Sequence, residues 1–459
     1  MYGFLFLVGV SLTGLPLLAQ SSPPPIVEQP QQVRPLPGKV DPVLMFNSNS
    51  PEVVQTEGIL LSTFPSAGMK VPTAHLNLRL QGRFDLFAHH IARANPPEDL
   101  RTLYLGIILH NPSQQTVTVN ILQAASYLSQ PDAPFIELPP VSENDLGTVF
   151  AGPGDRITND VLRRERQPGW PAQIVIPPGQ SQMLMNLPIP VKTLTPPING
   201  RSTLIRVQTN GPVYAASLGM FARTDLEGNE RPPTLEEWST LLQTAGLSGP
   251  RDKAPTPPNA PGKLVYGRVA GVAQGSRWQA QLSDAGRSGL KLTIPVRGAA
   301  FSYMLSSLPG GTFGTGEVQS APLLVRYPDT AYQAHGNYGL EYDLSLPLYN
   351  PTKQSQTIAL TLQTPLKSDQ PATSLRFYNP PPRRVFFRGT IRLRYRSDGG
   401  TPQTRYIHLV QQQGQQGEAL LTLTLAPGEL RLVQVQLLYP PDATPPQVLT
   451  VKTLTEPEL

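Results

Sequence analysis

Polar and apolar residues alternate along much of this chain with a period of two residues. Clear examples cover residues 116–121 in the first half and 356–362 in the second half. Their apolar members are Val117, Val119, Ile121, Ile358, Leu360 and Leu362. A period of two is typical of a β-strand that buries one of its faces. The pattern therefore predicts short antiparallel strands whose apolar faces pack against a second layer.

Turn residues divide these alternating stretches. The 459 residues include 53 prolines and 38 glycines, a composition that argues against long helices. Asn-Pro precedes both stretches, at 111–112 and 350–351, and Pro-Gly follows each of them at 178–179 and 427–428. Proline presets φ at the first central position of a turn, and glycine accepts a positive φ at the next one. We therefore expect an all-β fold built from two-sheet sandwiches.

Three segments of the first half recur in the second half in the same order. The pairs are LLSTFP at 60 and MLSSLP at 304, HNPSQQTVTVNIL at 110 and YNPTKQSQTIALTL at 349, and IVIPPGQSQMLMNL at 174 and LTLAPGELRLVQVQL at 423. Such colinearity indicates a tandem duplication of a unit of roughly 200 residues. The predicted fold is therefore two tandem, mutually similar antiparallel β-sandwich modules of the Ig-like type.

Composition sets the predicted boundaries of these modules. The proline-rich stretches PPPIVEQPQQVRPLP at 23–37 and SGPRDKAPTPPNAPG at 248–262 interrupt the strand pattern and predict extended linkers. We expect the first of them to be a tether that joins no core. The predicted organisation is a signal peptide at 1–19, a tether at 20–42, a first module at 43–231, a helix and linker at 232–262, and a second module at 263–459.

One short linking helix is predicted at the end of the first module. Thr234 and Glu237 have the spacing of a capping box, in which each side chain accepts a hydrogen bond from the backbone of the other residue. Apolar residues recur at helical spacing after this box, namely Leu235, Trp238, Leu241 and Leu242. We expect this helix to act as a structural clamp between the modules.

The N-terminal segment indicates export. Residues 4–18, FLFLVGVSLTGLPLL, are apolar, and Ala19 and a polar run follow them. This stretch is shorter than the ~20 residues that span a membrane, so it predicts a cleaved signal peptide, with a retained anchor as the alternative. No later stretch of the sequence has the length and apolar character of a transmembrane helix. We expect the mature protein in the periplasm or outside the cell.

Charge and cysteine content narrow the classes of function. The formal net charge is only +5, and charged residues make up 15% of the chain, which disfavours a nucleic-acid partner. The sequence contains no cysteine, which excludes disulfides, thiolate metal sites and a cysteine nucleophile. No GxSxG, HExxH, P-loop or dinucleotide-binding motif is present. We therefore expect no cofactor and favour a binding role over catalysis.

Several strings of residues resemble a known family. They are NSNSPE at 47, GILLSTFP at 58, GRFDLFAHH at 82, YGRVAGV at 266 and RYPDTAYQAHGNYG at 326. The chain, over nearly all of its length after the tether, is similar to exported cyanobacterial proteins catalogued only as a domain of unknown function. The resemblance implies an envelope or extracellular setting. It implies no activity, substrate or catalytic residue.

A row of arginines is the clearest charge pattern. Arg392, Arg394 and Arg396 alternate with apolar or aromatic residues, so their guanidinium groups are expected on one face of a strand. Arginine binds planar oxyanions in a bidentate manner, so the row would suit sulfate, phosphate or carboxylate groups of an envelope polysaccharide. The alternative interpretation is an edge strand whose charges prevent aggregation.

The segment 326–343 is a second candidate. We interpret it as a long surface loop that binds a ligand through Tyr332, His335 and Tyr338. Its carboxylates, in the region from Asp329 to Asp343, also allow the hypothesis of a secreted carbohydrate-active hydrolase. Because Glu341 and Asp343 are two residues apart on a predicted strand, they are expected to share one face.

The histidines of the first half suggest a weaker alternative, a periplasmic metal-binding protein. They are His75, His89, His90 and His110. Imidazole suits zinc or copper, but these histidines lack the close spacing of a typical metal motif. We therefore expect no metal ligands among them. The favoured hypothesis is an exported, non-enzymatic structural or binding protein of the cell envelope or extracellular matrix, with a polysaccharide or an envelope protein as its partner.

Overall fold

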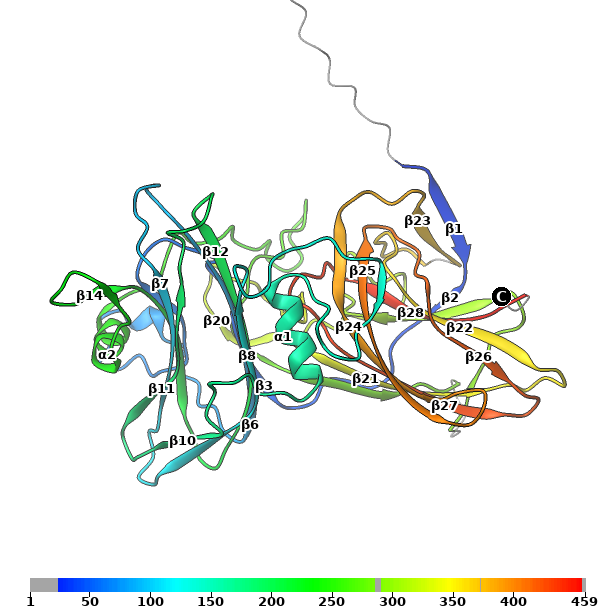
Figure 1. Cartoon of the computed structure of the whole chain (residues 1–459), viewed down its shortest axis with the longest axis horizontal. Helices are drawn as coiled ribbons and strands as arrows, with labels where there is room; N and C mark the ends of the chain where they lie inside the picture. Colours follow the sequence, from blue (N-terminus) through cyan, green and yellow to red (C-terminus); the bar gives the residue numbers. More distant parts are fainter. Residues whose placement is uncertain (1–23, 285–289, 372, 456–459) are drawn as a thin grey trace, which may run out of the picture.

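The computed structural model describes residues 24–284, 290–371 and 373–455 (Figure 1). These residues form several sheets, in which most neighbouring strands are antiparallel, and little helix. This confirms the predicted all-β class and its sandwich-like layout. No helix in the described part of the chain has the length and apolar character needed to cross a membrane. The predicted signal peptide, residues 1–19, lies outside the described residues.

Two sheets form the first half of the molecule. The four-stranded sheet consists, in spatial order, of β11 (Ser181–Ile189), β7 (Leu103–His110), β13 (Tyr214–Phe221) and β5 (Gly58–Ser62). The eight-stranded sheet consists of β10 (Gln173–Ile176), β8 (Val117–Leu128), β12 (Ile198–Thr209), β6 (Arg83–Arg93), β3 (Leu44–Ser48), β16 (Ala270–Gln274) and β20 (Leu323–Arg326), with β4 (Val53–Val54) beside β6. Phe84, Leu105 and Ile205 are fully buried in the core between the two sheets.

Two further sheets form the second half. The seven-stranded sheet consists of β17 (Arg277–Gln281), β21 (Glu341–Tyr349), β27 (Leu430–Leu438), β24 (Val385–Arg396), β25 (Pro402–Gln412) and β9 (Val141–Glu143), with β18 (Leu292–Thr293) beside β21. The five-stranded sheet consists of β2 (Gln32–Arg34), β19 (Ala300–Leu305), β28 (Gln447–Thr453), β22 (Gln356–Gln363) and β26 (Ala419–Leu425). Leu344, Leu360 and Val435 are fully buried between these sheets. Two small ribbons, β1 (Ile26–Pro30) with β23 (Ser374–Tyr378) and β14 (Arg223–Thr224) with β15 (Glu230–Arg231), complete the strands.

The two halves share a strand order and a corner. The order β10-β8-β12-β6-β3 matches β26-β22-β28-β19-β2, and in both series the last pair is parallel. The Asn111 side chain donates to the carbonyls of Gln115 and Ile176, at 2.7 and 2.9 Å. Asn350 makes the equivalent bonds to Gln354 and Leu425, at 2.8 and 3.0 Å. The repeated Asn-Pro and Pro-Gly turns therefore meet in space and build the same corner twice.

The remaining pair of repeated segments, LLSTFP at 60 and MLSSLP at 304, does not occupy equivalent positions in the two halves. The segment at 60 belongs mainly to β5, at the edge of the four-stranded sheet, whereas the segment at 304 begins in β19, inside the five-stranded sheet. The Ig-like type of the two sandwiches stays a prediction.

Strands cross the predicted module boundaries. β16 and β20, which follow residue 262 in the sequence, extend the eight-stranded sheet of the first half, because β16 pairs with β3. In the opposite direction, β9 adds to the edge strand β25 of the second half. The two halves therefore share backbone hydrogen bonds in both directions, and the boundaries of the sheets differ from those expected from composition.

The predicted tether also differs in the structure. β1 pairs with β23, and β2 pairs with β19, so the blue N-terminal strands lie against the second half in Figure 1. Leu36 is buried in the core of the second half, with 3% of its surface exposed. The expectation of a segment outside any core was wrong from residue 26 onward, because main-chain pairing holds it. Proline is compatible with this pairing in edge strands.

The predicted helix does not lie between the halves, and a second helix, which was not predicted, does. α2 (Leu235–Thr244) has the predicted capping box, with Thr234 N donating to Glu237 Oε2 at 2.7 Å. It covers the outer face of the four-stranded sheet, away from the second half. The helix between the halves is α1 (Pro153–Leu162), which contacts β8 and β12 on one side and β24 and β27 on the other. A 3₁₀ turn, η1 (Pro72–Ala74), is the remaining helical segment of the described residues.

Gly106 of β7 makes the close approach of α2 possible. The Trp238 ring is fully buried on this strand, and a Cβ atom at position 106 would lie 2.8 Å from Trp238 Cε2. We expect Gly106→Ala to lower the free energy of unfolding by about 1–3 kcal/mol, because the ring must shift in a packed site. Urea denaturation measures this loss. Gly399→Ala, at an open turn position, is the control, and an equal effect at both positions would contradict the packing argument.

Candidate functional site

The arginine row lies on a central strand. β24 pairs with β25 on one side and with β27 on the other, so the interpretation of the row as a protected edge strand was wrong. Ile391 and Leu393 of β24 point into the core of the second half and are fully buried. The alternating positions Arg392, Arg394 and Arg396 therefore lie on the outer face of the seven-stranded sheet.

Exposure changes along the row. Arg392 is buried, with 6% of its surface exposed, and its Nε donates to Gln436 Oε1 at 2.7 Å. Arg394 and Arg396 are exposed, and neither makes an ion pair with a described carboxylate. Arg396 Nη1 donates to the Gly400 carbonyl at 3.0 Å, which fixes this side chain against the β24–β25 turn. The row therefore ends in two guanidinium groups that are free to bind an anion.

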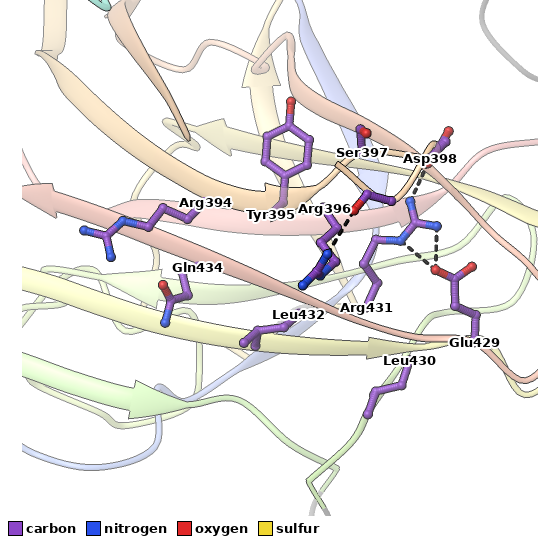
Figure 2. Close-up of a pocket in the computed structure, with 11 residues that line it drawn as sticks. Arg394, Tyr395, Arg396, Ser397, Asp398, Glu429, Leu430, Arg431, Leu432 and Gln434 are labelled. Atoms are coloured by element: carbon purple, nitrogen blue, oxygen red, sulfur yellow. Dashed lines mark hydrogen bonds and ion pairs between the residues drawn. The ribbon is translucent and has the colours of Figure 1, made fainter. Parts of the chain in front are cut away.

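An open pocket of about 570 Å³ lies at the exposed end of the row. Its lining residues are Arg394, Tyr395, Arg396, Ser397, Asp398, Gly400, Glu429, Leu430, Arg431, Leu432 and Gln434. Figure 2 shows Arg431 joined to both Asp398 and Glu429, with Nε donating to Glu429 Oε1 at 2.7 Å. Those two carboxylates more than compensate Arg431. The lining, with three arginines and two carboxylates, keeps a net charge of +1, which comes from Arg394 and Arg396.

Neighbouring strands extend the row into a polar band. Arg394 lies opposite Thr404 of β25 and Gln434 of β27. Gln434 lies opposite Ser345 of β21, which in turn lies opposite Gln281 of β17. Residues directly opposite each other on paired strands share a face, so donors and acceptors from five strands line one surface. The sequence had indicated the arginines alone, although the period of two over residues 430–436 places Gln434 on the same face.

The three predicted loop residues do not join this surface. His335 and Tyr338 line another pocket, of about 220 Å³, and Tyr332 is not part of its lining. The Tyr332 ring stacks on Arg326, whose Cζ lies 3.8 Å from the ring centroid. The His335 ring lies 4.9 Å from the Tyr266 ring, and burial lowers the pKa of His335 to about 4. Tyr338 packs on Phe87, with 6.0 Å between the ring centroids. The structure therefore brings His335 and Tyr338 together at one pocket and leaves Tyr332 apart from them.

The segment 326–343 runs between the halves, and the expectation of a surface loop was wrong. Tyr327 is fully buried in the core of the first half, where its hydroxyl donates to the Ala74 carbonyl at 2.8 Å. The same hydroxyl accepts a hydrogen bond from Ser62 N at 3.0 Å. This segment connects β20 in one sheet to β21 in another, so it has to cross the contact between the halves.

Glu341 lies at the centre of a buried ion network. Arg206 Nη1 and Arg164 Nη2 each lie 2.6 Å from its carboxylate oxygens, and Arg206 Nε lies 3.3 Å from Asp85. Only 1% of the Glu341 surface is exposed. Burial alone would raise the pKa of Glu341, but Arg206 and Arg164 outweigh it and lower the pKa to about 2. A carboxyl group with this pKa is ionised at neutral pH and is unsuited to act as a general acid.

The other carboxylates of this region are also paired with arginine. Asp343 shares the outer face of β21 with Glu341 and forms an ion pair with Arg277. Asp329 Oδ2 lies 2.7 Å from Arg251 Nε. Burial opposes ionisation of Asp329, but Arg251 lowers its pKa below the usual value. Both carboxylates are therefore engaged by arginine side chains.

Each histidine of the first half bonds to a different serine. The pairs are His75 with Ser62, His89 with Ser202, His90 with Ser48, and His110 with Ser181, at 2.8–3.0 Å. Within residues 24–284, 290–371 and 373–455, no three His, Asp or Glu side chains form a group suited to a metal ion. A serine hydroxyl that bonds a ring nitrogen orients the imidazole and satisfies a buried polar atom.

We predict a large loss of stability when the buried ion network around Glu341 is broken. We expect Glu341→Gln to lower the free energy of unfolding at pH 7 by about 3–5 kcal/mol, because Arg206 and Arg164 lose a buried counter-charge. Since the folded pKa of Glu341 is about 2, below its ordinary 4.5, its stabilisation is complete above pH 4.5. The wild type should lose this contribution as the pH falls from 4.5 towards 2, and the variant should not.

The matched control is Glu237→Gln. Glu237 also pairs with an arginine, Arg231, but this pair lies at the surface. Urea denaturation across this pH range should show a much smaller loss for the control, because solvent screens exposed ion pairs. Equal losses for the two variants would show that the buried network has no special role.

Comparison with known proteins gives a family and no activity. No curated protein matches this chain. A solved structure, the crystal structure of Lac15 from a marine microbial metagenome, is 12% identical, with a TM-score of 0.11. The match covers 83% of this chain and 54% of that chain, and so low a TM-score carries no argument. The model of the family described as "Protein of unknown function (DUF3370)" matches residues 31–453, so this chain belongs to that family.

Proposed function

We propose that this protein is an exported, non-enzymatic binding protein of the cell envelope or extracellular matrix. Its binding surface is the exposed end of the arginine row, where Arg394 and Arg396 bind anionic groups of an envelope polysaccharide. The observation that carries the proposal is that neither guanidinium has a carboxylate partner among the described residues, although both are held on a central strand. Arginine forms its strongest hydrogen bonds with carboxylate, sulfate and phosphate groups.

The surroundings of the two arginines favour a polymer over a small anion. The pocket is open, and Gln434 belongs to its lining. On the same sheet face, Gln434 lies opposite Ser345, which lies opposite Gln281. Side-chain amides and hydroxyls can both donate and accept hydrogen bonds, which suits the hydroxyl groups of a sugar chain. Two arginines at alternate positions of a strand are about 6.8 Å apart, so they would contact successive groups of an extended polymer.

Two observations support a role without catalysis. The carboxylates that would serve a hydrolase, Asp329, Glu341 and Asp343, each form an ion pair with arginine. The surface around Arg394 and Arg396 contains Asp398 and Glu429, but both are engaged by Arg431. A glycosidase needs one carboxyl group that stays protonated near its working pH. Each of these five carboxylates is instead engaged by an arginine.

The proposed location follows from the sequence. The apolar segment at 4–18 supports export, and the resemblance to exported cyanobacterial proteins supports an envelope setting. The sequence contains no cysteine, so the protein has no disulfide bonds, and its folding outside the cytoplasm would not depend on an oxidising compartment.

The test is binding of the full chain to an anionic polysaccharide. We expect retention on immobilised alginate or dextran sulfate that weakens as salt is added, because salt screens exposed charges. The double variant Arg394→Ala, Arg396→Ala should bind at least about tenfold more weakly, which corresponds to about 1.4 kcal/mol. Affinity electrophoresis in gels that contain the polysaccharide measures the change.

A charge-matched control separates this site from general attraction. Arg93 and Arg376 are exposed arginines on β6 and β23, and no described carboxylate pairs with either. The variant Arg93→Ala, Arg376→Ala removes the same charge and should keep wild-type retention. Equal loss in both double variants, or unchanged retention in the first, would overturn the assignment of the site.

A further inference from the structure

A second pocket, of about 360 Å³, opens at the side of the first half. It lies between β11 of the four-stranded sheet and β8 and β12 of the eight-stranded sheet, and the loop at 167–171 forms its rim. Its lining residues are Ser126, Asp132, Gln167, Pro168, Gly169, Trp170, Pro171, Leu184, Met185, Asn186, Leu187 and Arg201. Pockets of 300 Å³ and above are of the size that holds small ligands.

Arg201 is a buried charge without a counter-charge in contact. Only 5% of its surface is exposed, and no described carboxylate lies within ion-pair distance of its guanidinium. Nε and Nη2 donate to the Pro188 carbonyl at 3.0 and 2.8 Å, and Nη1 donates to Ser126 Oγ at 3.0 Å. These bonds use three of the five N–H groups, and two remain for a ligand.

Burial of such a group is costly unless it is fully bonded. Burial lowers the pKa of Arg201 to about 10, which leaves the guanidinium charged at neutral pH. Asp132 lines the same pocket, and its Oδ2 accepts a hydrogen bond from Leu128 N at 2.9 Å. A cationic donor and an anionic acceptor therefore line one pocket, which suits a ligand with several hydroxyl groups better than a simple anion.

Trp170 supplies an aromatic surface at the rim. It is half-buried, whereas Trp238 and Trp278 are buried, with 0% and 6% of their surfaces exposed. Its Nε1 lies 3.4 Å from Gln167 Oε1, a long hydrogen bond between two residues of the same loop. A tryptophan with an accessible ring offers an apolar plane beside polar side chains.

We infer that this pocket binds a sugar ring, with its C–H face on Trp170 and its hydroxyl groups hydrogen-bonded to Arg201 and Asp132. The inference goes beyond the proposed function, because it assigns a site in the first half that does not involve Arg394 or Arg396. A pyranose ring has both features that the pocket offers to bind, an apolar face and an edge of hydroxyl groups. The full protein would then bind saccharides at one site on each half.

The test is isothermal titration calorimetry, in which the full chain is titrated with a panel of hexaoses. The panel contains cello-, manno-, xylo- and galacturono-oligosaccharides, and inorganic phosphate is titrated separately. We expect saturable binding of at least one hexaose and none of phosphate. Trp170→Ala should weaken that binding at least tenfold, and so should Arg201→Lys, which keeps the charge but has fewer N–H donors. Tryptophan emission should change with sugar in the wild type.

Controls keep the result decisive. Trp170→Ala removes a half-buried loop side chain that packs at the edge of the core of the first half. Circular dichroism and the emission of Trp238 and Trp278 report whether this variant is folded. The Arg394→Ala, Arg396→Ala variant should bind neutral hexaoses as the wild type does, so failure of one site does not imply failure of the other. Binding of phosphate alone, binding of no sugar in the panel, or undiminished binding by folded Trp170→Ala would overturn the inference.

Discussion

The positive charge of Arg206, buried between carboxylates from both halves, holds this molecule in one arrangement. Asp85 comes from β6 of the first half and Glu341 from β21 of the second half, and both are almost completely inaccessible to solvent. A buried ion of either sign is costly unless its partner is in place. Separating the halves would therefore leave Arg206 and Glu341 without each other's buried charge. The strands that they exchange, β16 and β20 in one direction and β9 in the other, add backbone hydrogen bonds to it.

This contact also decides which part of the outer sheet face is available for binding. Near the first half, the face carries Glu341 and the buried Arg392, and α1 lies over β24 and β27. Farther along β24, Arg394 and Arg396 are exposed to solvent. One side of the seven-stranded sheet thus changes, within a few residues, from an internal contact to an open polar surface. The position of the proposed binding surface therefore depends on that contact.

The sequence predicted what depends on local patterns. The period of two indicated strands and the outward direction of the arginine row, and the Asn-Pro and Pro-Gly pairs located the repeated corner. The capping box located α2. α1 was missed because its N-cap, Gly152, has no side chain to signal a start, and a second glycine, Gly154, lies in its first turn.

Local patterns in the sequence did not predict which strands pair when they lie far apart in the chain. Nothing in the residues of β16, β20 or β9 indicates which distant strand each one joins, because a strand pairs through its backbone. For the same reason, the sequence did not indicate that Tyr327 lies in the core of the other half or that Glu341 faces two arginines. The burial of Arg392 and the exposure of Arg394 follow from the contact between the halves and not from their own strand.

The most direct test of this account is whether the halves unfold together. Hydrogen exchange followed by mass spectrometry at increasing urea concentrations reports on β12 and β21 separately. If the shared strands and the buried network join the halves into one cooperative unit, both strands should lose protection at the same urea concentration. Loss of protection in one half while the other remains folded would contradict the account.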